Sequence, residues 1–387
     1  MKLTLVISSL ACGGAERVMS IMANYWVTQG WDITLLTFDD GTIPPFYELN
    51  SRVIHQPLGI ASDSPNKIVA LWNNFQRIHK LRAAIAVSQP DAVVSFIDQV
   101  NILTLFAVNF PPFLQKKALS ESTYTIQKLP AIVAEHTDPR FHAIGLYWQF
   151  LRRLYYPLAA QVIFQGEELC SWARRAWWPS RVLAIPNPIF PPARSQFSSE
   201  NRSDLFPQPH TAIAMGRLHP VKGFDRLIEA FAEIAPRFPD WHLTILGEGE
   251  LRPQLEAQIA KLGLGHRISL PGRIDEPANV LGQADLFVLS SHYEGFPNAM
   301  LEAMACGLPA IALDTSSGPR AIVRHNIDGL LVSPTEKNAL SKAMADLMAD
   351  DDKRQNFAAR APEVLERFSP KRAIAAWEAV IAASLGL

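Results

Sequence analysis

Two glutamates, Glu294 and Glu302, lie eight positions apart in the segment HYEGFPNAMLEAMACGLP. Glu294 falls in a loop bounded by glycine and proline, whereas Glu302 falls in an apolar run that predicts a helix. We expect Asn298 to cap this helix and Ala299 to begin it, which would expose free N–H groups at the positive end of the helix dipole. Each carboxylate could then accept hydrogen bonds from a sugar ring, and the helix start could hold a diphosphate between two rings. The chemistry indicated is that of a nucleotide-sugar, with helix capping by Glu302 as the structural alternative.

A second loop, MGRLHPVKG, carries cations beside a predicted helix start. Gly216 and Arg217 follow an apolar strand, and Lys222 precedes the glycine that opens the next helix. Two cations at a helix N-terminus suit a phosphate group, although an exposed basic loop would have the same composition. Two further turns, LGEGEL with Gly247 and PGRI with Arg273, also follow strands, but each is a weak signal by itself.

The strands that must position these loops are continuous apolar runs. Runs of Val, Ile and Leu without alternation are typical of parallel sheets covered by helices on both faces. In the first half of the chain they span 3–8, 33–38, 52–56, 92–97, 131–136, 160–165 and 181–186. In the second half they span 211–216, 242–247, 267–272, 284–290 and 308–313, and residues 335–385 have a helical pattern.

A stretch rich in Pro, Ser and Asn separates the two halves. We therefore predict an α/β protein of two doubly wound Rossmann-like domains that face a central cleft. The predicted domains are 1–187 and 210–368, joined by a linker at 188–209. A C-terminal helix at 369–387 is expected to pack back toward the N-terminal domain. Ligands of open parallel sheets bind beyond the carboxyl ends of the strands, where the loops described above are expected to lie.

The composition excludes several classes of protein. A hydrophobic fraction of 48% predicts a large core, and a net charge of -1 argues against general nucleic-acid binding. The three cysteines lack metal-ligand or redox spacing, which suggests a reducing compartment. No apolar run is long enough to span a membrane, and MKLTLVIS reads as a buried strand rather than a signal peptide. We expect a cytoplasmic protein.

Basic and aromatic residues gather between residues 140 and 181. This segment holds six arginines and two acids, interleaved with Trp and Tyr. Apolar residues at helical spacing from Ile144 to Leu158 predict one buried stripe, which would leave Arg152 and Arg153 exposed. Arginine beside aromatic rings suits a membrane interface, so we expect a weak peripheral contact on the inner face of the plasma membrane. Buried aromatic rings beside solvated arginines are the alternative interpretation.

The ordered motifs of the chain resemble the family-4 retaining glycosyltransferases of the GT-B fold. The motifs are GGAERV, AEHTDP, IPNP, GRLHPVKG, LGEGEL, PGR, SHYEGFPNAMLEAMACGLP and DGLLV, and they cover nearly the whole chain. The E-x7-E pattern of Glu294 and Glu302 is the signature of that family. By contrast, GGAER after the first strand is not G-x-G-x-x-G, which disfavours an NAD-dependent dehydrogenase.

The resemblance implies a role for each candidate residue. Arg217 and Lys222 would bind the donor diphosphate, Glu302 the ribose and Glu294 the transferred hexose. His136 matches the family histidine close to the sugar, and it joins Arg217, Lys222 and Glu294 as a catalytic candidate. The other donor-binding candidates are Gly13, Gly14, Gly216, Gly247, Arg273, Ile274, Asn298 and Ala299.

The expected activity is transfer of a hexose or N-acetylhexosamine with retention, from a UDP-sugar rather than a GDP-sugar. GGAERV, EHTDP and FLRRLYYPLA resemble bacterial members that extend lipid-linked oligosaccharides or cell-surface polysaccharides, which implies a glycan or polyprenyl-diphosphate-linked acceptor. A front-face mechanism is expected, with double displacement through Glu294 as the alternative. A regulatory protein that only binds the nucleotide-sugar, and a GT-B-type epimerase or phosphorylase, are the rival functions.

No cofactor and no metal are expected. Many sugar transferases hold a divalent cation with a D-x-D pair after a strand. Asp39 and Asp40 lack the third position of such a pair. Asp350, Asp351 and Asp352 fit the pattern, but we interpret them as a solvated loop between helices.

Overall fold

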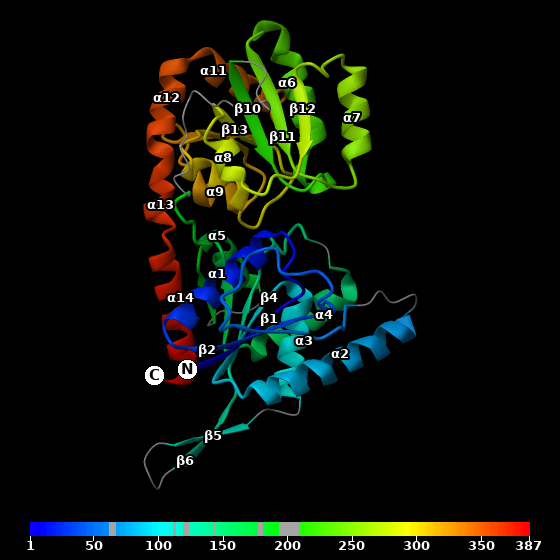
Figure 1. Ribbon diagram of the computed structural model, residues 1–387, viewed down its shortest axis with the longest axis vertical. Coiled ribbons are helices and arrows are strands. Elements are labelled where there is room, and N and C mark those ends of the chain that lie inside the picture. Colours follow the sequence, from blue (N-terminus) through cyan, green and yellow to red (C-terminus); the bar gives the residue numbers. More distant parts are fainter. Residues whose placement is uncertain (62–66, 111–113, 119–123, 143, 177–180, 193–208) are drawn as a thin grey trace. The chain divides into compact units, whose positions relative to one another are not determined.

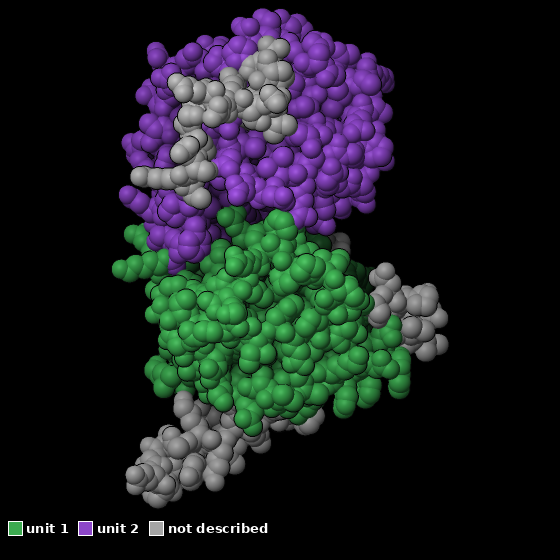
Figure 2. Space-filling view, in the orientation of Figure 1, with its two compact units in different colours: residues 1–186, 371–387 green, residues 187–370 purple. Residues whose placement is uncertain are grey.

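The computed structural model describes residues 1–61, 67–110, 114–118, 124–142, 144–176, 181–192 and 209–387. The chain divides into two compact units, which Figure 2 shows in different colours. Unit 1 comprises residues 1–186 and 371–387, and unit 2 comprises residues 187–370. Residues 193–208 of the predicted linker lie outside the described residues. Each unit contains its own parallel sheet, so the predicted α/β architecture of two Rossmann-like domains is confirmed.

Unit 1 is built on a sheet of seven parallel strands in the order β3-β2-β1-β4-β7-β8-β9. Figure 1 labels β1, β2 and β4 of this sheet. The strands are β1 (Lys2–Ile7), β2 (Asp32–Thr37), β3 (Ile54–Pro57), β4 (Ala92–Phe96), β7 (Ala131–Ala134), β8 (Gln161–Phe164) and β9 (Val182–Ala184). Strand β1 pairs with β2 on one side and with β4 on the other. The winding of the chain therefore reverses between β1 and β4, which creates a topological switch point. All predicted strands of this half are present.

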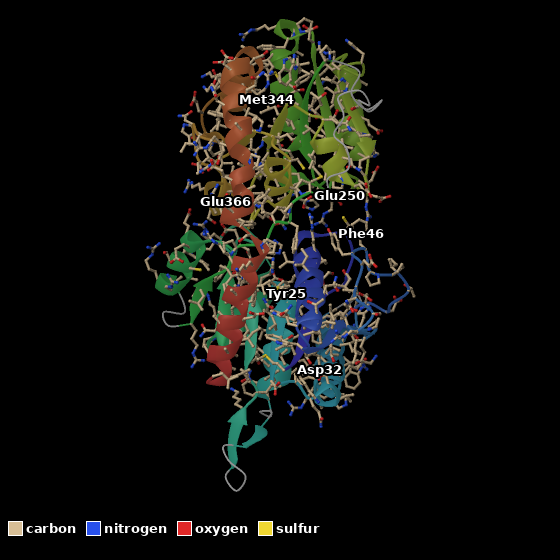
Figure 3. All side chains as sticks on the ribbon, turned by 60° about the vertical axis from the view of Figure 1, so that its left-hand side comes forward. Tyr25, Asp32, Phe46, Glu250, Met344 and Glu366 are labelled. Atoms are coloured by element: carbon tan, nitrogen blue, oxygen red, sulfur yellow. The ribbon has the colours of Figure 1, made fainter. Side chains whose placement is uncertain are left out.

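Helices cover both faces of this sheet. Helices α1 (Gly14–Thr28) and α14 (Pro370–Leu385) pack on one face, where Trp377 and Ile381 of α14 join the core beside α1, marked by Tyr25 in Figure 3. Helices α2 (Lys67–Ser88), α3 (Asp98–Asn109), α4 (Leu146–Tyr155) and α5 (Glu167–Ala176) form the other layer. The sequence did not predict a hairpin of β5 (Leu114–Ala118) and β6 (Tyr124–Lys128).

Helix α4 is shorter than the helical stripe predicted from Ile144 to Leu158. It begins after Gly145, whose φ of 80° is incompatible with a helix, and it is followed by the 3-10 turn η1 (Tyr156–Leu158). The predicted stripe is confirmed for Trp148, Leu151 and Tyr155, which pack against the core. The predicted exposure of Arg152 is wrong, because that side chain is only 1% exposed.

Unit 2 contains six parallel strands in the order β12-β11-β10-β13-β14-β15. They are β10 (His210–Met215), β11 (Trp241–Leu246), β12 (Ile268–Gly272), β13 (Leu286–Leu289), β14 (Ala310–Leu313) and β15 (Gly329–Val332). The five predicted strands are present, and β15 corresponds to the DGLLV motif. The winding reverses between β10 and β13, so this edge of the sheet is the second switch point.

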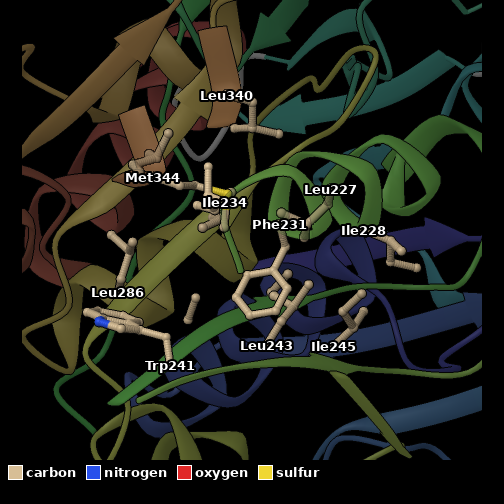
Figure 4. Packing of buried hydrophobic residues seen from close by; sticks show 14 of the residues in the cluster. Leu227, Ile228, Phe231, Ile234, Trp241, Leu243, Ile245, Leu286, Leu340 and Met344 are labelled. Carbon is tan, nitrogen blue, oxygen red and sulfur yellow. The ribbon is translucent and has the colours of Figure 1, made fainter. Parts of the chain in front are cut away.

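The helices of unit 2 enclose its sheet. They are α6 (Phe224–Ile234), α7 (Arg252–Lys261), α8 (Pro277–Leu281), α9 (Asn298–Ala305), α10 (Ser317–Ile322), α11 (Ala339–Ala349), α12 (Asp351–Arg360) and α13 (Val364–Arg367). On one face, Phe231 of α6 packs with Leu243 of β11 and Met344 of α11 (Figure 4). On the other face, Met300 and Met304 of α9 pack with β13 and β14. The packing of these two cores fixes the positions of the strand ends, and the loops of the candidate site follow those ends.

Among the helices that the structure describes, each is too short or too polar to cross a membrane.

Candidate functional site

The loops after β10, β11 and β13 meet closely at the switch point of unit 2. A Cβ atom at Gly247 would lie 2.0 Å from the carbonyl oxygen of Gly216, and one at Gly223 would lie 2.5 Å from that of Ser290. Only glycine permits backbones to approach in this way. The close backbone contacts at these glycines therefore bring the side chains of the three loops near one another.

Lys222 and Glu294 form an ion pair between two of these loops. Lys222 Nζ lies 2.7 Å from Glu294 Oε1, and that oxygen also accepts a hydrogen bond from Ser291 Oγ at 2.6 Å. The Glu294 main-chain N–H donates to Ser316 Oγ at 3.0 Å, which fixes the loop. The two side chains are 25% and 12% exposed, so a ligand can reach both groups.

The start of α9 differs from the prediction. Pro297, not Asn298, is the N-cap, and Asn298 is the first helical residue. The Asn298 side-chain oxygen instead accepts a hydrogen bond from Asn187 Nδ2 at 3.0 Å. Glu302 lies beyond the first turn and is half-buried, as is Ala299 near the helix start. The N-cap Pro297 has no main-chain N–H to donate, and Glu302 lies outside the first turn, so the capping-box interpretation of Glu302 is wrong.

The remaining donor-site candidates of unit 2 lie on loops at the same sheet edge. Arg217 follows β10 and Arg273 follows β12, and both are exposed. Ile274 is half-buried against the core. His219 Nε2 lies 3.7 Å from Glu250 Oε1. Glu250, labelled in Figure 3, lies on the loop after β11. The edge therefore presents Arg217, Arg273 and the Lys222–Glu294 pair, a set that could hold an anion and hydroxyl groups.

In unit 1, His136 lies just beyond the carboxyl end of β7. Its ring packs against Phe96 at 4.3 Å between centroids, and Phe96 packs against Trp377 of α14 at 5.7 Å. Within the described part of the chain, no hydrogen-bond partner faces the buried Nε2 of His136. Burial lowers the pKa of His136 to about 3, so its ring is neutral at physiological pH. A neutral ring can exchange hydrogen bonds with a ligand but supplies no positive charge.

Glu135, the neighbour of His136, is a buried acid that the sequence reasoning missed. Its carboxylate is fully buried, accepts a hydrogen bond from the Tyr156 hydroxyl and lies 3.5 Å from Arg152 Nη1. Burial, helped by the nearby charge of Asp98, raises the pKa of Glu135 to about 7, although Arg152 and the Tyr156 hydrogen bond oppose the increase. Arg152 is thus an internal partner of an acid rather than a surface contact.

Further polar groups extend this buried cluster. Asn101 Nδ2 donates to the Ala134 carbonyl at 2.9 Å and to Tyr156 Oη at 3.2 Å. His142 Nε2 lies 3.3 Å from Asp98 Oδ2, and this hydrogen bond raises the pKa of His142. The only sequence signal for the cluster was the pair of polar residues in AEHTDP at a strand end.

The other arginines of 140–181 also differ in surroundings. Arg174 donates to the main-chain carbonyl of Val182 at 2.9 Å, so it is partly engaged inside unit 1. Arg153 is exposed as expected, and Arg175 is exposed too. Trp177 and Trp178, which contributed to the membrane prediction, lie outside the described residues. A surface made of all these arginines is therefore not present.

Gly13 and Gly14 lie at the switch point of unit 1. Gly13 is the N-cap of α1 and Gly14 is its first residue. A Cβ atom at Gly13 would lie 2.1 Å from Glu16 Oε2, so the absence of a side chain leaves room for that carboxylate.

Among the described residues, no group of three or more His, Cys, Asp or Glu side chains could hold a metal ion. The Asp350 side chain accepts a hydrogen bond from the Lys353 main-chain N–H at 2.8 Å and caps α12. Asp351 and Asp352 form the first turn of that helix. The prediction of an interhelical loop is therefore wrong for two of the three aspartates, because they begin a helix.

Residues 196–364 match the family model described as "Glycosyl transferases group 1". The whole chain is also similar to bacterial proteins. It is 25% identical to a Campylobacter jejuni protein named as a "GalNAc-alpha-(1->4)-GalNAc-alpha-(1->3)-diNAcBac-PP-undecaprenol alpha-1,4-N-acetyl-D-galactosaminyltransferase", over 99% of this chain and 98% of that protein. It is 22% identical to the amylovoran biosynthesis glycosyltransferase AmsD of Erwinia amylovora, over 98% and 99% of the two chains.

Solved structures share the fold. Sucrose-phosphate synthase from Thermosynechococcus elongatus matches with a TM-score of 0.79 and 19% identity, over 100% of this chain and 99% of that chain. Anabaena Alr3699/HepE, solved in complex with UDP, matches with a TM-score of 0.76 and 19% identity, over 99% and 100%. The chain therefore has the GT-B fold and carries, in residues 196–364, a domain of the glycosyl transferases group 1 family.

Proposed function

We propose that this protein is a retaining glycosyltransferase that moves a hexose or N-acetylhexosamine from a UDP-sugar to a polyprenyl-diphosphate-linked glycan. The observation that carries the proposal is the ion pair of Lys222 and Glu294 at the switch point inside the matched domain. An ammonium group suits a diphosphate, and a carboxylate suits sugar hydroxyls. The activity named for the Campylobacter jejuni protein supports a lipid-linked acceptor, and the structure of Anabaena Alr3699/HepE with UDP supports a UDP donor.

Different loops of unit 2 bind different parts of the donor. Lys222 and Arg217 bind the diphosphate, Glu302 accepts hydrogen bonds from the ribose, and Glu294 accepts them from the hexose. In the free protein, Glu294 Oε1 is held by Lys222 and Ser291. An incoming diphosphate and hexose would compete with these contacts, so the ion pair keeps both groups in place until the donor arrives.

Transfer takes place on the front face of the donor. The bond from the anomeric carbon to the diphosphate oxygen breaks, and the acceptor oxygen bonds to that carbon from the same side. The acceptor proton passes to an oxygen of the leaving β-phosphate, whose charge is offset by Lys222, Arg217 and the N–H groups at the start of α9. Double displacement would require Glu294 as the nucleophile, but an ammonium 2.7 Å from Oε1 weakens its nucleophilicity.

The proposed reaction needs no divalent metal because fixed cations of unit 2 take that role. Transfer in excess EDTA is therefore expected at the untreated rate. Loss of activity in EDTA that Mn²⁺ restores would contradict this part of the proposal.

The donor is tested by thermal shift with UDP, GDP and ADP and with their sugars. A ligand that binds the native state raises the melting temperature, and the largest increase is expected with the UDP compounds. Glu302→Gln should weaken UDP binding by about tenfold or more, because a hydrogen bond to a charged acceptor is stronger than one to an amide. Glu366→Gln, a change at an exposed carboxylate on α13, is the matched control and should bind UDP as the wild type does.

The transfer step is tested with UDP-N-acetylhexosamines and a polyprenyl-diphosphate-linked glycan. Formation of an α-linked product from an α-linked donor is expected, and NMR coupling constants at the anomeric carbon identify it. An inverted product would contradict the retaining mechanism. Tight UDP binding without transfer to any glycan would favour the regulatory alternative.

A further inference from the structure

Helix α4 is apolar on two sides, and only one of them is covered. Trp148, Leu151 and Tyr155 face the core of unit 1. The other side carries Leu146, Tyr147, Phe150 and Leu154, which are 85%, 50%, 62% and 52% exposed. A surface helix of a globular protein normally has a polar outer face. This outer face therefore lacks the composition that contact with water alone would favour.

The exposed side chains form one continuous stripe. Positions 146, 147, 150 and 154 follow the helical spacing of one, three and four residues, so they lie along one side of α4. Phe141, just before the helix, is 48% exposed as well. Contiguous exposed apolar side chains of this kind mark a binding surface rather than chance exposure.

The sequence around the stripe is basic. The sequence contains no Asp or Glu between Asp138 and Glu167. Arg153 lies beside Leu154 and is exposed, whereas Arg152 is turned into the core against Glu135. Arg140, closer to the acids in the sequence, pairs with Asp138 at 2.7 Å and with Glu168 at 3.0 Å. The outer face of α4 thus combines large apolar groups with one cation and no anion.

We propose that the outer face of α4, formed by Leu146, Tyr147, Phe150, Arg153 and Leu154, docks unit 1 onto an anionic lipid bilayer. The apolar side chains enter the boundary between headgroups and acyl chains, Tyr147 keeps its hydroxyl among the headgroups, and Arg153 contacts lipid phosphates. The proposal rests on the proposed function in one respect, because a polyprenyl-linked acceptor would lie in such a bilayer.

A second copy of the chain fits this face less well than lipid does. A two-fold interface through α4 would bring the same patch of both copies together, including both Arg153 side chains. Helix α4 has no acid that could pair with them. Anionic phosphates, in contrast, would neutralise each arginine separately.

The test uses flotation of the full chain with vesicles of phosphatidylglycerol and phosphatidylcholine. The triple variant Leu146→Gln, Phe150→Gln, Leu154→Gln should lower partitioning at least about tenfold, since it removes the groups that enter the bilayer. Arg153→Gln should lower it about fivefold and reduce its salt dependence. The matched control changes Ile43, Ile54 and Val87 to Gln, because they are also exposed apolar residues of unit 1 but lie outside α4. It should bind like the wild type.

Two outcomes would overturn the docking surface. The first is unchanged vesicle binding by the triple variant. The second is a concentration-dependent dimer in light scattering that the triple variant abolishes, because this would assign the face to a second copy. UDP thermal shift separates this test from the proposed function: a triple variant that keeps the UDP shift and loses vesicle binding supports docking. Wild-type protein that binds vesicles through α4 but shows no UDP shift would contradict only the proposed function.

Discussion

Each sheet has a polar cluster at its carboxyl edge, but the cluster of unit 2 is partly exposed and the cluster of unit 1 is buried. In unit 2, Lys222 and Glu294 remain 25% and 12% exposed. In unit 1, Glu135 and Arg152 are 0% and 1% exposed, and burial moves the pKa of Glu135 up to about 7. The difference arises from what covers each strand end. Glycine-rich loops leave the edge of unit 2 open, whereas α4 and η1 place Arg152 and Tyr156 over Glu135.

The same sheet topology therefore serves ligand binding in unit 2 and a structural role in unit 1. Exposed charges can exchange their partners for a ligand, so the unit 2 cluster suits donor binding. Buried charges that already have partners cannot be reached, and they are costly to leave unpaired. The unit 1 cluster is therefore suited to holding the loop around His136 in one conformation.

The largest expected effect comes from removing the exposed cation. Lys222→Ala should lower the transfer rate by on the order of 10²–10³-fold, as for loss of one group that stabilises developing negative charge. Lys342→Ala is the matched control, since Lys342 is also paired with a glutamate, at 2.9 Å, but on a surface helix of unit 2. Steady-state kcat values check the prediction. Similar rates for both variants would mean that the edge of unit 2 does not stabilise the leaving group.

The buried acid of unit 1 should make stability depend on pH. The ordinary pKa of a glutamate here is 4.5 and the folded value is about 7, so between these pH values the folded protein binds more protons than the unfolded chain. Stability therefore falls as pH rises through this window, by on the order of 3 kcal/mol in total. Glu135→Gln should remove this decline. Urea unfolding of both proteins from pH 4 to pH 8, compared as a difference, measures it.

The difference between variants is needed because His136 acts in the opposite direction. Its folded pKa of about 3 lies below the ordinary 6.5, so the unfolded chain binds more protons and stability rises with pH over that interval. Glu168→Gln, at an exposed partner of Arg140, is the control and should leave the pH profile unchanged. A Glu135→Gln profile parallel to that of the wild type would show that Glu135 is already ionised in the folded protein.

The sequence predicted the open cluster better than the buried one. Continuous apolar runs located the strands, and glycine, cations and acids directly after them located Lys222 and Glu294. Pattern reasoning could not find the Glu135 cluster because its members come from β7, α3, α4 and η1, which only the fold brings together. Helical spacing also misplaced Arg152, since a stripe drawn from apolar residues alone cannot recognise a buried acid as the partner of an arginine. Asn298 was misplaced for a similar reason: its partner, Asn187, is distant in sequence.

The close approach of loops in unit 2 can be tested at Gly247. Its φ of 137° disfavours any other residue, and an added Cβ would lie 2.0 Å from the Gly216 carbonyl oxygen. Gly247→Ala should therefore destabilise unit 2 by about 2 kcal/mol more than a control glycine substitution does, and it should weaken UDP binding. The control is Gly263→Ala, where φ is 69° but no atom lies within 4 Å of the added Cβ. Urea unfolding and UDP titration check both variants. Equal losses would show that backbone strain alone, and not loop contact, determines the result.

The smallest expected effect concerns the support of His136 from the end of the chain. Trp377 of α14 packs against Phe96, which packs against His136, so the C-terminal helix acts on this ring through one intermediate. Trp377→Leu removes an aromatic contact of about 1 kcal/mol and should lower kcat about fivefold with little change in the KM for the donor. Trp377→Phe should restore most of the rate because it keeps a ring. Trp26→Leu is the matched control: Trp26 lies in the same core, stacked on Trp31 at 5.3 Å. A general loss of stability would lower kcat equally in both Leu variants and would not be rescued by Phe, whereas positioning of His136 predicts a loss confined to Trp377→Leu.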